Sequence, residues 1–344
     1  MFAKSDKKPA KFQWKSIIKT NIMILRVVGL WPRGAEGYEP NLYTLYSAVL
    51  NFVVSCSSIF QSAYIFLIYT DLQALAAIIF VIFTDWLAAV KVCYFVFKTS
   101  ILKEQMTELE STMFQPQLAQ QRVFQASVTS WRLIYTAFSV LTIITLHLWT
   151  FFPILDGTVK EHRLPFWAWY PYDAHSSPLY ELTYVHQIIS VWCLAMANVN
   201  MDALIAALMM FISAQCDVLS DNLKGLTGDD FNDKLVECIK HHKRIVRFAA
   251  NCNRFFNEIA LGQFFTSSAS LALAMFQLTL VEPLSSECYS LLFYVSAITV
   301  QIFLYCWCGT DVEVRCSASH NDQVRLEIHD QDEPPDAETD RTLA

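Results

Sequence analysis

The stretch LTYVHQIISVWCLAMANVNMDALIAALMMFISAQC, residues 182–216, decides the fold class, because Asp202 is its only Asp, Glu, Lys or Arg. A helix needs about 20 mostly apolar residues to cross the hydrocarbon core of a bilayer. Five more stretches of this kind occur, although Asp85 and Lys91 interrupt one of them. The six predicted spans are residues 41–69, 72–97, 133–155, 182–216, 259–281 and 288–310. We therefore predict an all-α fold, a polytopic membrane bundle of six transmembrane helices.

The composition of the whole chain is typical of a membrane protein. Of its 344 residues, 54% are hydrophobic and 17% are charged, against roughly 45–50% and about 25% in soluble proteins. The net charge of −7 comes mostly from residues 316–344, and no basic face indicates nucleic-acid binding. The common nucleotide-binding, metalloprotease and hydrolase motifs are missing from the sequence. We therefore expect no enzyme, no cofactor and no metal site.

The distribution of basic residues predicts the orientation of the bundle. Of the Lys and Arg outside the spans, 22 lie on the side that holds both termini and two on the other side. Cytosolic loops are enriched in these residues, so we expect a cytosolic N-terminus. We divide the chain into a cytosolic N-terminal segment (1–40), a transmembrane domain (41–315) and an acidic tail (316–344). The tail is polar and contains Pro334-Pro335, so we expect it to be disordered.

Three charged residues lie inside the predicted spans. Asp85 and Lys91 are six positions apart, which places them about 120° apart around a helix, so they do not form a simple pair. We expect the Lys91 side chain to extend toward the cytosolic edge and Asp85 to face a neighbouring helix. For Asp202 we expect a structural role, in water or in an interhelical salt bridge.

The loop between the third and fourth spans carries a dense pattern of aromatic residues and prolines. Its marked residues are Pro165, Phe166, Trp169, Tyr170, Pro171, Ser177, Pro178, Tyr180 and Glu181. Residues 238–264 and 305–315 add two further marked segments. In this order and spacing, the three segments resemble insect odorant receptors, and the resemblance covers residues 15–315.

The resemblance implies a function. Members of that family are seven-helix, nonselective cation channels that small volatile ligands open directly. A ligand-tuning subunit assembles with a shared coreceptor into a tetramer in the membrane of olfactory sensory neuron dendrites, and the seventh helices line the pore. By resemblance, this chain is a ligand-tuning subunit in the plasma membrane, and its partners are the coreceptor, a volatile organic ligand and membrane lipid.

One departure from the family pattern leaves alternatives open. Residues 316–344 are too polar to form the seventh helix, so we expect that helix to be missing, through an alternative transcript or a gene-model end. A non-conducting or dominant-negative subunit is therefore an alternative function. A gustatory receptor of the same superfamily shares the topology but fits the loop pattern less well. A six-span transporter is disfavoured because we find no internal repeat.

The candidate ligand pocket follows from the predicted depth of each residue in the membrane. The family's pocket lies in the outer half of the bundle, and aromatic, Met and Thr side chains suit a mostly apolar site. In the outer halves of spans two, three, four and six, these residues are Phe80, Phe83, Thr142, Thr145, His147, Trp192, Met196 and Tyr294. For His147, a helix–helix hydrogen bond is the alternative role.

Overall fold

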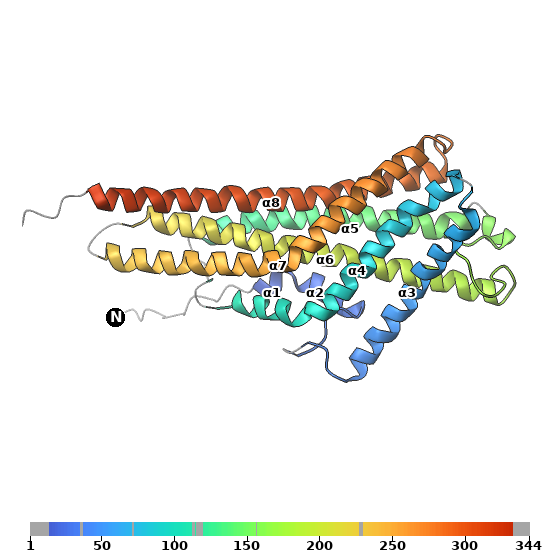
Figure 1. Ribbon diagram of the computed structural model, residues 1–344, viewed down its shortest axis with the longest axis horizontal. Coiled ribbons are helices and arrows are strands. Elements are labelled where there is room, and N and C mark those ends of the chain that lie inside the picture. The colour runs from blue at the N-terminus through green and yellow to red at the C-terminus, as the bar shows by residue number, and fades with distance from the viewer. Residues whose placement is uncertain are drawn as a thin grey trace, which may run out of the picture.

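The computed structural model describes residues 14–34, 37–70, 72–111, 114, 120–155, 157–226 and 230–332. Within these ranges all regular structure is helical (Figure 1). The helices are α1 (Trp14–Ile17), α2 (Lys19–Val27), α3 (Leu42–Ile68), α4 (Leu72–Glu108), α5 (Gln121–Leu155), the 3-10 helix η2 (Thr158–Glu161), α6 (Leu179–Lys224), α7 (Phe231–Leu278) and α8 (Ser286–Asp332). In this described part, six helices, α3 to α8, are long and apolar enough to cross a membrane. The predicted all-α bundle with six membrane-capable helices is confirmed.

Three of the helices are much longer than a bilayer requires. Helices α6, α7 and α8 have 46, 48 and 47 residues, against the roughly 20 that cross hydrocarbon. We call the end of the bundle that holds residues 157–178 the loop end and the opposite end, which holds the α6–α7 turn, the far end. The loop end lies on the right of Figure 1 and the far end on the left, where α6, α7 and α8 continue side by side.

Helix α6 forms the centre of the bundle. It packs against α8, α5, α7, α2, α3 and α4, and every residue from Val199 to Leu208 is buried. A helix that is apolar on all sides is typical of such a central position. The alanines among these residues let the neighbouring helices approach closely. The stretch that decided the fold class is therefore also the core of the molecule.

The N-terminal helices α1 and α2 pack against α6 near the middle of the bundle. Trp14 and Leu25 are buried, and the Trp14 ring meets Phe211 edge-on with ring centroids 4.3 Å apart. The side-chain amide of Asn21 donates to the Asn200 carbonyl oxygen at 2.8 Å. This segment is therefore part of the hydrophobic core.

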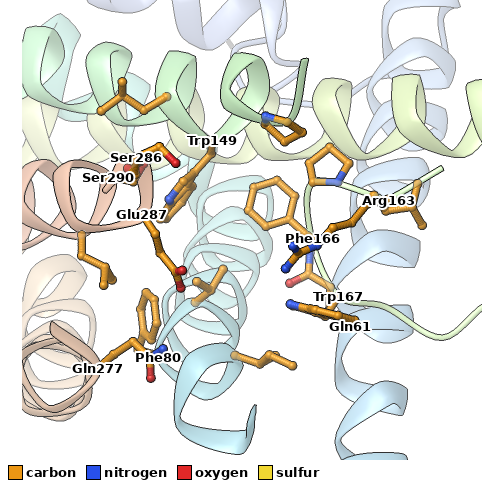
Figure 2. A pocket seen from close by; sticks show the side chains of 17 residues that line it. Gln61, Phe80, Trp149, Arg163, Phe166, Trp167, Gln277, Ser286, Glu287 and Ser290 are labelled. Carbon is orange, nitrogen blue, oxygen red and sulfur yellow. Dashed lines mark hydrogen bonds between the residues drawn. The ribbon is translucent and has the colours of Figure 1, made fainter. Parts of the chain in front are cut away.

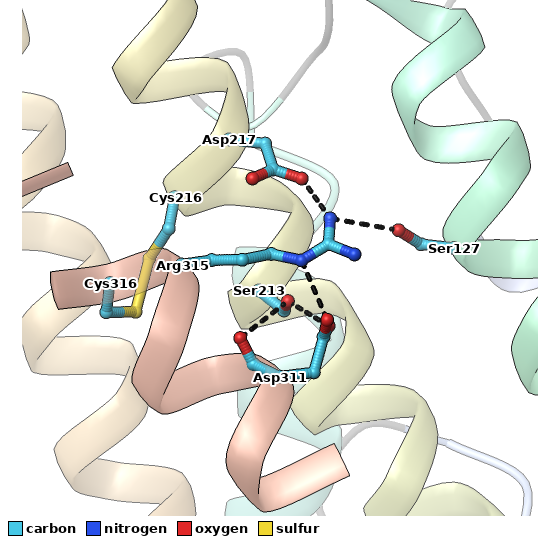
Figure 3. A network of polar contacts seen from close by, with 7 residues as sticks. All are labelled: Ser127, Ser213, Cys216, Asp217, Asp311, Arg315 and Cys316. Carbon is cyan, nitrogen blue, oxygen red and sulfur yellow. Dashed lines mark hydrogen bonds and ion pairs between the residues drawn. A yellow bond between two sulfur atoms is a disulfide. The ribbon is translucent and has the colours of Figure 1, made fainter. Parts of the chain in front are cut away.

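The chain after Arg315, where we expected a disordered tail, is part of helix α8. It continues as a helix to Asp332, so residues 316–332 correct that expectation, while residues 333–344 lie outside the described residues. A disulfide joins Cys216 of α6 to Cys316 of α8 (Figure 3), and Ser319 is buried. We based the expectation on composition, which takes no account of tertiary contacts, and no Gly or Pro interrupts the chain between Gly309 and Pro334.

Candidate functional site

Two cavities lie in the loop-end half of the bundle. The one nearer the loop, which we call the vestibule, has a volume of about 250 Å³ and lies among α3, α4, α5, α7, α8 and the loop (Figure 2). Its lining consists of Gln61, Ile78, Phe80, Val81, Leu148, Trp149, Pro153, Arg163, Leu164, Pro165, Phe166, Trp167, Gln277, Ser286, Glu287, Ser290 and Leu291. Figure 2 shows the Glu287 carboxylate directed into this space and Arg163 on another side of it. The Arg163 guanidinium lies 5.2 Å from the centre of the Trp167 ring.

Helix α6 anchors the loop that closes the vestibule. The Gln187 side chain accepts a hydrogen bond from the Phe166 N–H and donates one to the Phe166 carbonyl, both at 3.0 Å. Tyr180 donates to the Arg163 carbonyl at 3.0 Å. Tyr170 is also buried, and burial raises the pKa of its phenol to about 12. The loop is thus held to the bundle through its backbone.

The marked loop residues divide into lining and anchoring positions. Pro165 and Phe166 line the vestibule, whereas Tyr170 and Tyr180 are buried anchors. Trp169 is partly exposed, and its backbone N–H donates to the backbone carbonyl of Phe60 in α3 at 3.0 Å. Ser177 and Pro178 directly precede α6, and Glu181 lies in its first turn, whereas Pro171 lies earlier in the loop.

An aromatic partition separates the vestibule from the second cavity. Trp149 of α5 lines both spaces, and its ring centre lies 5.5 Å from that of Tyr294 of α8. The Phe80 ring of α4 is 5.1 Å from Tyr294 on the vestibule side. The Tyr294 hydroxyl and the Thr84 hydroxyl are 2.7 Å apart, which fixes the tyrosine to α4. The rings of Trp149, Tyr294 and Phe80 thus contact one another where the two cavities adjoin.

The second cavity, which we call the inner cavity, lies among α4, α5, α6 and α8 and has a volume of about 80 Å³. Its lining consists of Val81, Thr84, Asp85, Ala88, Phe138, Thr142, Thr145, Leu146, Trp149, Val191, Leu194, Ala195, Asn198, Val199, Tyr294, Ala297, Ile298 and Gln301. Asp85 is the only Asp, Glu, Lys or Arg in this set. The threonine hydroxyls of Thr142 and Thr145 donate to carbonyls of their own helix, each at 2.9 Å. They therefore present mainly their methyl groups to the cavity.

The lining of the inner cavity is a set of helical stripes. On α4 the lining positions are 81, 84, 85 and 88, on α6 they include 191, 194, 195 and 198, and on α8 they are 294, 297, 298 and 301. Each set has the i, i+3, i+4, i+7 spacing of one helix face. On α5 the corresponding positions include 138, 142, 145 and 149. Four helices thus turn one face each toward the same small space.

A buried ion-pair network forms the floor of the inner cavity. The Lys91 ammonium lies 2.6 Å from a carboxylate oxygen of Asp202, and the two side chains are 1% and 0% exposed. Asn198 lines the cavity and accepts a hydrogen bond from Lys91 at 2.9 Å. Gln301 also lines the cavity and donates to Asp202, which in addition accepts from the Tyr305 hydroxyl at 2.7 Å. Through Gln263, a further acceptor for Lys91, the network links α4, α6, α7 and α8.

The expectation for Lys91 is therefore wrong. We expected its side chain to extend to the cytosolic edge, but it stays buried, because α6 and α7 bring three oxygen acceptors around the ammonium group. A charge in hydrocarbon is stabilised when it is paired and hydrogen-bonded. For Asp202, the structure shows the interhelical salt bridge.

The structure brings together part of the set predicted to form the pocket. Thr142, Thr145 and Tyr294 line the inner cavity, and Phe80 lines the vestibule beside Tyr294. The other four described residues, Phe83, His147, Trp192 and Met196, are in the lining of neither cavity.

These four side chains lie on other faces of their helices. His147 is exposed and contacts Phe151 and Trp192, and its Nδ1 lies 2.8 Å from the Ile143 carbonyl oxygen of its own helix. Trp192 donates to the Thr150 hydroxyl at 3.2 Å. Met196 packs against the large hydrophobic core, and Phe83 is half-buried on α4.

Several residues that line the inner cavity are not among the predicted pocket residues. Asp85 was recognised as an intramembrane charge but was not assigned to the pocket. Asn198 and Gln301 were not singled out, although both are amides within apolar stretches. Their position one helix turn from other lining residues could have identified them, but only once one lining residue of each helix was known.

Comparisons with known proteins agree with this arrangement. The family model described as 7tm Odorant receptor matches residues 71–321. The chain is 23% identical over 325 residues to Odorant receptor Or1 of Anopheles gambiae, over 85% of this chain and 77% of that protein. It is 24% identical over 280 residues to Odorant receptor 85b of Drosophila melanogaster, over 77% of this chain and 71% of that protein.

Solved structures show the same fold. The insect olfactory receptor OR5 from Machilis hrabei superposes with a TM-score of 0.75 at 20% identity, over 91% of this chain and 84% of that chain. The structure of the same receptor in complex with eugenol gives the same TM-score and identity, over 85% of that chain.

Proposed function

This chain belongs to the 7tm odorant receptor family, a receptor family of membrane proteins, and from that premise we propose that it binds a small volatile ligand in the inner cavity. The observation that carries the proposal is the convergence of four helix stripes on one mostly apolar space. Ligand sites of this kind are concave and apolar, with a few polar groups that fix orientation. The Machilis hrabei receptor, which shares the fold, has been solved with eugenol.

The dimensions of the inner cavity support a weak, apolar mode of binding. Burial of apolar surface contributes about 25 cal/mol per Å², and a space of about 80 Å³ accepts only a small molecule. The affinity is therefore modest, as suits a volatile ligand that has to dissociate again. The vestibule supplies the route from the loop end, and Trp149 and Tyr294 move aside to admit the ligand.

The ion-pair floor supports a link between ligand binding and the rest of the bundle. Asn198 and Gln301 each touch both the cavity and the Lys91–Asp202 pair. A ligand shifts a conformational equilibrium only by its different affinity for the two states. In this proposal, the ligand favours one arrangement of these two amides, and the network carries that preference to α7 and α8.

The function test is ligand binding to the purified receptor in lipid nanodiscs, with eugenol and pentan-1-ol as probes. We expect saturable binding of at least one probe. Replacing Ala195 of the inner cavity by Phe fills the space, so Ala195→Phe lowers the affinity by at least about tenfold. Ala137 is exposed on α5 and lines neither cavity. Ala137→Phe is therefore the matched control and leaves the affinity within about twofold.

Two results would contradict this proposal. One is a folded receptor that binds none of eugenol, pentan-1-ol and pentylamine saturably. The other is saturable binding that Ala195→Phe and Ala137→Phe leave equally unchanged, because the ligand then occupies a different place.

We further propose that the chain acts with the shared coreceptor as the tuning subunit of a cation channel, in the plasma membrane of sensory dendrites with its N-terminus in the cytosol. The excess of Lys and Arg on the side of the termini supports this orientation. In cells that express the coreceptor, we expect the chain to add a current evoked by the bound ligand. Without that current, a reduction of the coreceptor's own current supports the alternative of a non-conducting subunit.

A further inference from the structure

Asp85 is an intramembrane carboxylate that faces the inner cavity. It lies on the α4 stripe with Val81, Thr84 and Ala88. Among the ion pairs formed by described residues, none includes Asp85. A carboxylate has about four acceptor positions. Asp85 therefore has acceptor positions left for a ligand.

The nearest basic residue on the same helix does not balance this charge. Lys91 lies one and two-thirds turns further along α4, and its ammonium group is held by Asp202, Asn198 and Gln263. Moving it toward Asp85 would leave Asp202 buried without its cation, which is strongly unfavourable. The cavity thus contains one carboxylate without a cation of the protein beside it.

Several other polar groups of the inner cavity already have partners. The Thr142 and Thr145 hydroxyls bind backbone carbonyls, and the Tyr294 hydroxyl is bonded to Thr84. The Asn198 oxygen accepts from Lys91. Of the lining groups, Asp85 is therefore the strongest acceptor that remains for a ligand.

The aromatic residues of the lining also suit a cation. Trp149, Tyr294 and Phe138 all face the same cavity as Asp85. The faces of aromatic rings attract ammonium groups within about 6 Å. In the vestibule, Glu287 adds a second carboxylate on the route inward, while Arg163, the basic residue there, lies over the Trp167 ring.

We propose that the ligand of the inner cavity is a small aliphatic amine, whose nitrogen binds the Asp85 carboxylate and whose hydrocarbon body packs against Leu194 and Ile298. This inference rests on the proposed function and names its ligand class. An ammonium group opposite a carboxylate makes a neutral pair, so the complex places no uncompensated charge in the membrane. The cavity volume of about 80 Å³ limits the body to a short chain.

The test compares pentylamine with pentan-1-ol, which has the same chain length and a neutral head group. Binding to the purified receptor in nanodiscs is measured for the wild type, Asp85→Asn and Asp233→Asn. We expect the wild type to bind pentylamine at least about tenfold more tightly than pentan-1-ol. Because the negative charge that pairs with the ammonium group is lost, Asp85→Asn lowers the pentylamine affinity by about tenfold to a hundredfold and changes that of pentan-1-ol by less than about threefold.

Asp233→Asn is the matched control, because Asp233 is exposed in the first turn of α7, outside both cavities. It leaves both affinities unchanged. If Asp85→Asn does not fold, the affinities of the wild type for the two probes decide alone. Pentylamine that binds the wild type no more tightly than pentan-1-ol overturns the inference. Equal effects of Asp85→Asn on both probes overturn it as well. Binding of pentan-1-ol without preference for the amine leaves the proposed function standing, whereas the failure of pentylamine, pentan-1-ol and eugenol to bind contradicts both.

Discussion

Two charged clusters tie α8 to α6, and they differ in their access to water. The Lys91–Asp202 network beneath the inner cavity is almost fully buried, with side chains 1% and 0% exposed. Near the far end, Arg315 binds Asp217 and Asp311, and these side chains are 24–29% exposed (Figure 3). Both clusters pair basic and acidic side chains across helices. We therefore expect burial, more than the number of ion pairs, to decide how much each cluster contributes to the stability of the fold.

The two clusters also have different hydrogen-bond partners. In the buried network, Asp202 receives bonds from Lys91, Gln301 and Tyr305, so its carboxylate satisfies three donors at once. Arg315 is bonded to two carboxylates and to the Ser127 hydroxyl, but water replaces such bonds easily at a half-buried site. We therefore expect removal of a partner to be far more damaging in the first cluster.

The largest effect is expected for Asp202→Ala. This change leaves the Lys91 ammonium buried without its counter-charge and destabilises the fold by about 3–5 kcal/mol. Reversible unfolding of the purified protein in detergent measures the difference in free energy. The double variant Lys91→Met, Asp202→Leu is the control, because replacing both charges by apolar groups recovers most of the stability. A double variant no more stable than Asp202→Ala would show that the pair is not a separable unit.

A smaller effect is expected for Arg315→Leu. It removes two partly exposed ion pairs, which together contribute about 1–2 kcal/mol. The loss shrinks as the salt concentration rises from about 0.15 M to about 1 M, because the Debye length falls from about 8 Å to about 3 Å. The effect of Asp202→Ala does not change with salt. Unfolding measured at both salt concentrations tests the contrast. If the destabilisation by Arg315→Leu did not depend on salt, this cluster would be as well shielded from water as the Lys91–Asp202 network.

The exposed pair between Lys15 and Glu110 gives the lower end of the same scale. Its side chains are 54% and 37% exposed, so Lys15→Ala changes the free energy of unfolding by less than about 1 kcal/mol. The order Asp202, Arg315, Lys15 is the order of burial. A different order in the measured free energies would break the comparison.

The amino-acid sequence predicted which segments form the bundle but not which faces of the helices meet. Trp192 and Met196 were assigned to the pocket from their depth in the membrane, yet Ala195 and Asn198, on the next face of α6, line it. Thr142 and Thr145 do line the cavity. Depth follows from counting residues along a helix, whereas rotation about the axis depends on neighbours that are distant in the sequence.

The charged residues show the same limit. Asp85, Lys91 and Asp202 could be recognised as unusual from the sequence, because each interrupts an apolar stretch. That Lys91 pairs with Asp202, 111 positions away, and that Asp85 is left facing the cavity, could not be predicted. The polarity of residues 316–332 predicts disorder, but α8 continues through them to Asp332. At the start of this stretch, the disulfide of Cys316 with Cys216 joins α8 to α6.

The sequence by itself determined the number of membrane-capable helices, the all-α fold class and the family. Apolar length is a local property, and it alone decides whether a segment can cross a bilayer. Only the tertiary structure decided which side chains enclose the inner cavity and which charges neutralise each other. The physical reason is that lipid and protein interior are both apolar, so the hydrophobic pattern of a membrane helix does not mark its inward face. That face is chosen by packing and hydrogen bonding between helices, as the network around Asp202 shows.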